Sequence, residues 1–266
     1  MIRPALLVLF ASLAAPLAAQ TRTELDVMGS RGAVLGWEAV GRLETGRGFC
    51  TATLIARDFV LTAAHCVHDV AGRPVAAANL RFRAGYQNGQ AIAERGITEY
   101  RVGAGYTDTG DGQLDATMIA NDVALLRLDT EIFAAEARPF TLATTPPEGS
   151  AVSVVSYGRG RAEVLSREAR CALVGRFVEG ILGFDCSVTF GSSGAPVFIR
   201  ENGRLRILSI ISGGNADVAY GPGLTAQVSA LKAQFADGAA RTEPGPGARV
   251  IGIGERSDSG AKFVRP

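Results

Sequence analysis

Residues 144–149 read Thr-Thr-Pro-Pro-Glu-Gly and divide the chain into two groups of short predicted strands. Consecutive prolines followed by glycine favour a turn and disfavour a helix or a central strand. Apolar and alternating runs before this turn predict strands at 39–43, 51–55, 59–62, 80–84 and 123–128. Similar runs after it predict strands at 151–156, 196–199 and 205–211. This pattern predicts an all-β fold of two packed β-barrels.

The second group carries a hairpin signal and a helix signal. Asn202 and Gly203 between two strands predict a tight hairpin turn. Val228, Leu231 and Phe235 recur at helical spacing and predict a short C-terminal helix at about 229–236. Residues 238–266 are rich in Gly, Pro, Arg and Ser, so we expect a flexible C-terminal tail.

The composition is that of a globular protein. The chain has 266 residues, of which 47% are hydrophobic and 20% charged, so it can bury a substantial core. A formal net charge of +1 gives no strong field toward nucleic acid or an anionic membrane, and we expect neither as a partner. His65 and His68 are the only histidines, so any histidine chemistry must use one of them.

The first nineteen residues have the pattern of a signal peptide. Arg3 precedes an apolar stretch at 5–15 that is too short to span a bilayer, and Ala18 and Ala19 offer a cleavage site. We therefore expect a secreted or periplasmic protein with no membrane partner after removal of residues 1–19. An uncleaved anchor is the alternative, which the short apolar length disfavours. Residues 20–36 are interpreted as an N-terminal extension or short pro-segment.

The predicted export bears on the state of the four cysteines, because disulfides form in oxidising compartments. An even number in an oxidising compartment predicts two disulfides, for which three connectivities exist. We prefer the pairs Cys50–Cys66 and Cys171–Cys186, because each closes a short local loop. A metal site is the rival interpretation of 65–69, but no second ligand pair stands at the usual zinc spacing. We expect no metal and no cofactor.

Three segments together indicate nucleophilic catalysis. Residues 60–66 read VLTAAHC, residues 121–126 read NDVALL and residues 191–196 read GSSGAP. A serine hydroxyl needs a base to take its proton and an acid behind that base. We assign Ser193 as the nucleophile, His65 as the base and Asp122 as the group that orients it. The backbone N–H groups of Gly191 and Ser193 are the candidates for an oxyanion hole.

These segments resemble the three signatures of the chymotrypsin-like (trypsin-fold) serine peptidases. The similarity covers about 37–235, and Ser212-Gly213-Gly214 resembles the substrate-binding edge of that family. The resemblance implies a peptidase domain at 37–237, a peptide or protein substrate and two six-stranded antiparallel barrels, at about 37–143 and 150–228. The active site would lie in the cleft between them. We expect a monomer.

Ser192 departs from the pattern of many animal members of this family. They carry Asp at this position, and that Asp pairs with a newly cut terminal amine. A neutral hydroxyl cannot form this ion pair, so we expect no such zymogen switch, although residues 33–36 loosely resemble the family's cut terminus. The chain is more similar to the bacterial glutamyl-endopeptidase-like (V8-like) branch, in which a small residue and Pro follow Gly-x-Ser-Gly.

The specificity pocket is assigned by spacing from Ser193. Its expected residues are Ser187 at the floor, Val188 beside it, and Ile211, Ser212, Gly214 and Gly223. A floor without an acid disfavours cleavage after Arg or Lys, unless a loop shift brings in Asp185. The absence of a histidine near Ile211 disfavours Glu. We therefore expect an apolar or permissive pocket for the residue before the scissile bond (P1).

Several alternatives stay open at this point. A catalytically silent homologue that binds peptides or proteins is the main functional alternative. An α/β-hydrolase esterase is disfavoured, because that fold orders its triad Ser, Asp, His. Residues 108–112 (DTGDG) are interpreted as a loop, with calcium binding as the alternative, since they lack EF-hand spacing.

Overall fold

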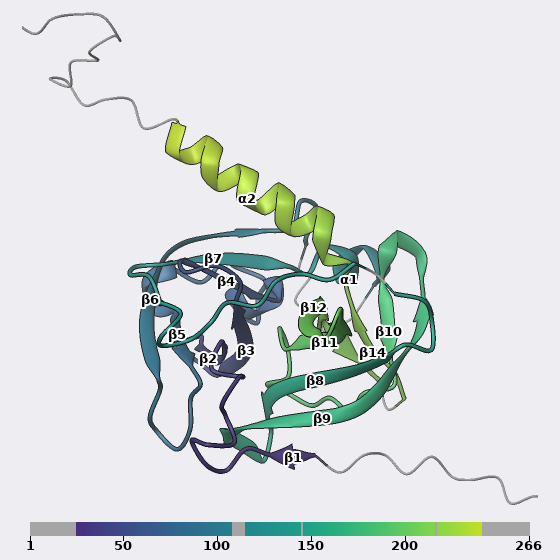
Figure 1. Cartoon of the computed structure of the whole chain (residues 1–266). Helices are drawn as coiled ribbons and strands as arrows, with labels where there is room; N and C mark the ends of the chain where they lie inside the picture. Colours follow the sequence, from purple (N-terminus) through teal and green to yellow (C-terminus); the bar gives the residue numbers. More distant parts are fainter. Residues whose placement is uncertain (1–24, 108–114, 145, 216, 241–266) are drawn as a thin grey trace, which may run out of the picture.

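The computed structural model describes residues 25–107, 115–144, 146–215 and 217–240. The predicted signal peptide and the loop at 108–112 lie outside the described residues, as does the predicted tail from residue 241 onward. Figure 1 shows two packed β units with a long helix crossing one of them.

Among the described residues, the first unit is a closed antiparallel barrel of six strands in the order β2-β3-β4-β7-β6-β5. The strands are β2 (Val40–Glu44), β3 (Phe49–Leu54), β4 (Phe59–Thr62), β5 (Arg81–Ala84), β6 (Ala93–Val102) and β7 (Ala124–Leu128). The nearly continuous apolar run of β7 is buried between β4 and β6, as its sequence predicts.

The second unit is a curled sheet rather than a second closed six-stranded barrel. Within the described residues its order is β12-β11-β8-β9-β10-β14-β13. These strands are β8 (Ala151–Gly158), β9 (Arg161–Arg176), β10 (Leu182–Phe184), β11 (Pro196–Glu201), β12 (Arg204–Ile210), β13 (Gly213–Gly214) and β14 (Ala219–Gly221). Among the described residues, β12 pairs only with β11 and β13 only with β14, so the sheet is not closed between its two ends.

The predicted hairpin joins β11 to β12. Asn202 and Gly203 both adopt positive φ angles, of 50° and 75°, as a two-residue hairpin turn requires. The mostly-β architecture with two β units and a C-terminal helix, predicted from the sequence, is thus confirmed.

Helices are few in the described part of the chain. They are α1 (Ala116–Asn121), α2 (Leu224–Ala240) and the 3-10 turns η1 (Ala64–Val67), η2 (Ala77–Asn79) and η3 (Val178–Gly180). Helix α2 is longer than the predicted 229–236, because Leu224 is also buried on the stripe formed by Val228, Leu231 and Phe235. Its contacts with β6 and β7 place it across the first barrel (Figure 1).

The N-terminal segment belongs to both units. Strand β1 (Asp26–Val27) pairs with β9 of the second unit, and the carbonyl of Met28 accepts a hydrogen bond from Gln87 of the first. Met28 and Val34 are buried. Residues 26–36, assigned from sequence to an extension or pro-segment, therefore pack as part of the folded body.

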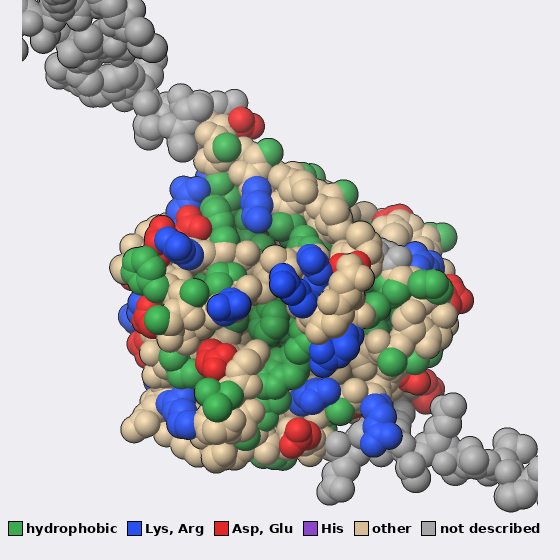
Figure 2. All heavy atoms as spheres, in the orientation of Figure 1, with side chains coloured by type: hydrophobic (Ala, Val, Ile, Leu, Met, Phe, Trp, Pro, Cys, Tyr) green, Lys and Arg blue, Asp and Glu red, His purple; other side chains and the backbone are tan. Residues whose placement is uncertain are grey.

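No helix in the described ranges combines the length and the apolar character needed to cross a bilayer. On the face shown in Figure 2, basic and acidic side chains are intermixed, with apolar side chains between them.

Candidate active site

His65 lies just beyond the end of β4, in the 3-10 turn η1. The preceding strand is buried, and the disulfide Cys50–Cys66 ties the turn to β3. The second disulfide joins Cys171 to Cys186, so the structure has the two pairs expected from the sequence. The imidazole of His65 is about a quarter exposed, with a side-chain accessibility of 25%. The base candidate is thus fixed by its backbone but open to solvent.

Asp122 stands between two elements that together fix its position. It caps the C-terminal end of α1 and is followed by Val123 and the buried strand β7. Helix α1 begins after Asp115, whose carboxylate accepts a hydrogen bond from the backbone N–H of Met118. Asp122 is fully buried.

The carboxylate of Asp122 holds the ring of His65. Its Oδ2 lies 2.8 Å from His65 Nδ1, and its Oδ1 accepts the backbone N–H of His65 at 2.9 Å. The hydroxyl of Ser212 also donates to Oδ2. Because a carboxylate only accepts, Nδ1 carries the proton of the neutral ring, which leaves Nε2 as the basic nitrogen. A buried acid therefore fixes both the orientation and the tautomer of His65.

Ser193 lies in a tight turn that leads into β11. Gly191 and Gly194 have φ angles of 93° and 75°, which favour glycine. A Cβ atom at Gly194 would clash with the hydroxyl of Thr62 and with the carbonyl of Thr51. Among the described residues, neither the N–H of Gly191 nor that of Ser193 donates to a protein acceptor. The turn therefore presents two N–H groups beside the serine.

Thr51 of β3 is a contact residue that the sequence analysis missed. Its N–H donates to the carbonyl of Ser193 at 2.9 Å, and its hydroxyl donates to the carbonyl of Gly191 at 2.8 Å. The same hydroxyl accepts the N–H of Tyr157 at 3.0 Å. The first barrel thus holds the serine turn of the second unit directly.

Two charged residues under the same turn, a buried glutamate and a half-buried arginine, were also missed. Glu168 is 2% exposed and accepts the N–H of Ser187 at 2.6 Å. Arg161 donates to the hydroxyl of Ser192 at 3.3 Å. No strand was predicted over 161–176, so only the cross-strand packing in the structure identifies these two residues.

The structure brings together some of the residues that were assigned to the specificity pocket by their spacing from Ser193. Val188 lies against Gly214, where an added Cβ would be 3.4 Å from a methyl group of Val188. Ile211 and Ser212 are buried, and Ser187 is half-buried. The N–H of Gly223 is bonded instead to the carbonyl of Gly180.

Asp185, the acidic alternative for the pocket floor, is exposed. Its carboxylate accepts the backbone N–H of Ala172. This bond holds the side chain at the β9 strand, so the acidic group nearest the floor by contact is Glu168 and not Asp185.

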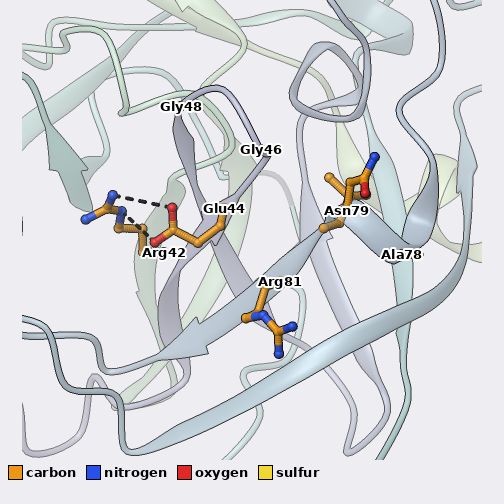
Figure 3. Close-up of a pocket in the computed structure, with 8 residues that line it drawn as sticks. Arg42, Glu44, Gly46, Gly48, Ala78, Asn79 and Arg81 are labelled. Carbon is orange, nitrogen blue, oxygen red and sulfur yellow. Dashed lines mark hydrogen bonds and ion pairs between the residues drawn. The ribbon is translucent and has the colours of Figure 1, made fainter.

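An apolar cavity of about 430 Å³ adjoins the pocket edge. It is lined by Ala116, Ile119, Phe177, Val178, Ile181, Gly214, Asn215 and Tyr220. A second cavity, of about 410 Å³, lies beside the ion pair of Arg42 and Glu44 on the first barrel (Figure 3). Its lining includes none of the candidate catalytic residues.

Two clusters combine side chains that ligate metals elsewhere. They are Cys50 with His65 and Cys66, and Cys171 with Asp185 and Cys186. In both, the sulfur atoms form a disulfide, so neither cluster offers the thiolate that a metal requires.

The fold of this chain is similar to that of several proteins of known structure. A Glu endopeptidase solved with MPD has a TM-score of 0.62 and 22% identity, covering 75% of this chain and 91% of that one. The thermostable serine protease AL20 from an extremophilic microorganism gives 0.58 and 22%, covering 77% and 98%. Protease Anisep from Arthrobacter nicotinovorans gives 0.59 and 18%, covering 75% and 96%.

Sequence comparison identifies the family. Trypsin epsilon of Drosophila erecta is 25% identical over 213 residues, which cover 69% of this chain and 75% of that protein. The profile of the family described as Trypsin matches residues 26–235, the greater part of the chain. The chain therefore belongs to the trypsin family of serine endopeptidases.

Proposed function

We propose that this protein is an exported serine endopeptidase that hydrolyses peptide bonds through an acyl-enzyme intermediate. The observation that carries the proposal is the 2.8 Å contact between His65 Nδ1 and the fully buried Asp122 carboxylate. A buried acid that fixes one ring nitrogen leaves the other as a general base. The turn at Ser193 supplies the hydroxyl on which that base would act.

In the proposed mechanism, Ser193 Oγ attacks the carbonyl carbon of the scissile bond. His65 Nε2 takes the hydroxyl proton and later gives it to the leaving amine. Asp122 stabilises the imidazolium that forms between these steps. The N–H groups of Gly191 and Ser193 stabilise the negative oxygen of the tetrahedral intermediate. Water then attacks the acyl-enzyme, with His65 again acting as base.

The proposed substrate is a peptide, and the proposed P1 pocket is apolar or permissive. The contact of Val188 with Gly214 and the burial of Ile211 favour an apolar wall. The Glu168 carboxylate behind Ser187 is 2% exposed and accepts the Ser187 N–H, so we do not expect it to select a basic P1 residue. The adjoining apolar cavity would take side chains further toward the amino end of the substrate.

The proposed enzyme needs no activating cut near its N-terminus. Ser192 cannot form an ion pair with a new amine. The segment that would be cut is also integrated, since Val34 is buried and Arg31 donates to the carbonyl of Gly85 at 2.8 Å. Cleavage at 31–36 would disrupt these contacts.

A fluorophosphonate probe tests the proposal without knowledge of the substrate. The full chain, exported to an oxidising compartment, should be labelled stoichiometrically, and Ser193→Ala and His65→Ala should lose the label. His68→Gln is the matched control. His68 sits in the same segment, but its Nδ1 lies 2.7 Å from the carbonyl of Ala64 rather than near Asp122, so we expect labelling to persist.

Folded wild-type protein that stays unlabelled would contradict the proposal and favour the silent peptide-binding homologue. Labelling that appears only after a cut at 31–36 would contradict the absence of a zymogen switch. A library scan of P1 with dominant cleavage after Arg, Lys or Glu would contradict the proposed specificity.

A further inference from the structure

A buried polar cluster lies directly beneath the turn that carries Ser193. Ser192 is fully buried and Ser156 of β8 is 3% exposed. The guanidinium of Arg161 donates to the carbonyl of Ser156, to its hydroxyl at 2.9 Å and to the hydroxyl of Ser192 at 3.3 Å. The proposed mechanism uses none of these three side chains, although Ser192 is the immediate neighbour of the nucleophile.

The backbone makes room for this arginine. Arg161 is the first residue of β9 and pairs with Gly158 across the turn from β8. A Cβ atom at Gly158 would meet both the Arg161 guanidinium and the side chain of Thr189. Glycine at this position therefore lets the guanidinium reach inward rather than into solvent.

The hydroxyl of Ser192 connects Arg161 to the rest of the turn. It donates to the carbonyl of Tyr157 at 3.4 Å and accepts the N–H of Thr189 at 3.3 Å. The N–H of Ser192 in turn donates to the carbonyl of Thr189 at 2.9 Å. A charged donor strengthens such a hydrogen-bond network more than a neutral one does.

The same strand also holds the other end of the segment at 187–192. Glu168, seven residues after Arg161 on β9, accepts the N–H of Ser187 at 2.6 Å. Burial holds the pKa of Arg161 below its ordinary value, and the charge of Glu168 partly offsets this effect. A buried glutamate and a half-buried arginine on one strand thus contact the predicted pocket floor and the serine turn, respectively.

We propose that Arg161 is a positioning residue that holds the turn at 191–193 in the conformation that presents the Gly191 and Ser193 N–H groups to substrate. It acts through the hydroxyl of Ser192. In many animal members of the family, this position holds the Asp that forms an ion pair with the newly cut terminal amine. The role rests on the proposed function, since it concerns the same reaction.

The first experiment compares Arg161→Ala with Arg170→Ala. Arg170 is an exposed arginine on the same strand and serves as the matched control. We expect Arg161→Ala to lower kcat on the order of 10²-fold, as loss of an oxyanion donor does, with KM within about threefold. The pH midpoint of kcat/KM should stay in place, because the His65–Asp122 pair is intact. Added guanidinium ion should restore part of kcat in Arg161→Ala only.

A double-mutant cycle tests whether Arg161 acts through Ser192. Ser192→Ala removes the hydroxyl without removing the arginine. If the two side chains act together, Arg161→Ala/Ser192→Ala should be no slower than the slower single variant. Multiplicative effects of the two substitutions would contradict the proposal.

The outcomes separate this role from the proposed function. Wild-type protein that no probe labels would overturn both. Wild-type protein that is labelled, with kcat unchanged in Arg161→Ala, would overturn the role of Arg161 alone. If Arg161→Ala does not fold, Arg161→Lys keeps the charge but loses the fork-shaped donor, and it should show the same fall in kcat with unchanged KM. Wild-type kinetics in Arg161→Lys would then overturn the role.

Discussion

The backbone N–H of Thr51, in the first barrel, donates to the carbonyl oxygen of Ser193 in the second unit at 2.9 Å. The Thr51 hydroxyl extends this contact to Gly191 and Tyr157. One residue thus sets the position of the serine turn relative to the unit that carries His65 and Asp122. The geometry of the site therefore depends on a contact between the two β units.

Thr51→Val should weaken this contact while preserving shape. The valine leaves the carbonyl of Gly191 and the N–H of Tyr157 without their hydroxyl partner, which costs about 1–3 kcal/mol. We expect a lower free energy of unfolding in urea and a lower kcat. Thr53→Val is the matched control, because Thr53 Oγ1 is buried on the same strand without a hydrogen-bond partner among the described residues. Equal losses in the two variants would contradict the proposed role of Thr51.

Asp122→Asn should abolish most activity without unfolding the protein. An amide can donate to Nδ1 and so favour the wrong tautomer of His65, which lowers kcat on the order of 10⁴-fold. Asp129→Asn is the control, since Asp129 is exposed just after the opposite end of β7. Steady-state hydrolysis of a peptide substrate measures both. Asp122→Asn with wild-type kcat would exclude the proposed orienting role.

Replacing Cys171 and Cys186 together by Ala should lower both stability and substrate binding. The bridge spans 15 residues, so its loss costs about 3 kcal/mol, or roughly 6–12 °C in Tm. Because Cys186 immediately precedes Ser187, we also expect KM to rise. Thermal unfolding and steady-state kinetics measure the two effects. An unchanged Tm would mean that the protein does not form this bridge.

The Asp69 carboxylate in the loop at 69–73 should stabilise the folded protein at neutral pH but not in strong acid. Hydrogen bonds from the side chain and backbone of Arg73 lower the pKa of Asp69 from 3.8 to about 2. A carboxyl group whose pKa is lower in the folded state stabilises the fold fully when the pH is above the pKa of the unfolded state. This contribution is lost as the pH falls through the folded-state pKa of about 2. The Tm difference between wild type and Asp69→Asn should therefore shrink between pH 4 and pH 2.

The variant Arg73→Leu tests whether Arg73 causes this pH dependence. It removes the largest source of the lowered Asp69 pKa. In that background, Asp69→Asn should change Tm less at pH 6 than it does in the wild type. An equally large change in both backgrounds would contradict the assignment to Arg73.

Features that depend on neighbours in sequence were predictable. Strand β7 follows from its continuous apolar run, and the β11–β12 hairpin follows from Asn202-Gly203. The pairs Cys50–Cys66 and Cys171–Cys186 close short loops, which made them the preferred choice.

Features that depend on packing between distant strands were not predictable. The charged residues Arg161 and Glu168 lie on β9, a strand that was not predicted from the sequence, and both reach the underside of the segment at 187–192. Thr51 resembles any β-branched strand residue until its partner from the other unit is known. The opening of the second sheet between β12 and β13 is likewise a matter of strand pairing, which the sequence of β13, Gly-Gly, does not specify.

The pairing of β1 with β9 constrains the order in which the protein can be completed. Strand β1 can pair with β9 only after the residues of the first barrel have been synthesised, so the ends of a long loop must meet before the sheet is complete. The amino-terminal segment thus joins the two halves of the fold. Such a chain should unfold in one cooperative step, and a cut between the halves should yield two fragments that associate rather than two independent domains.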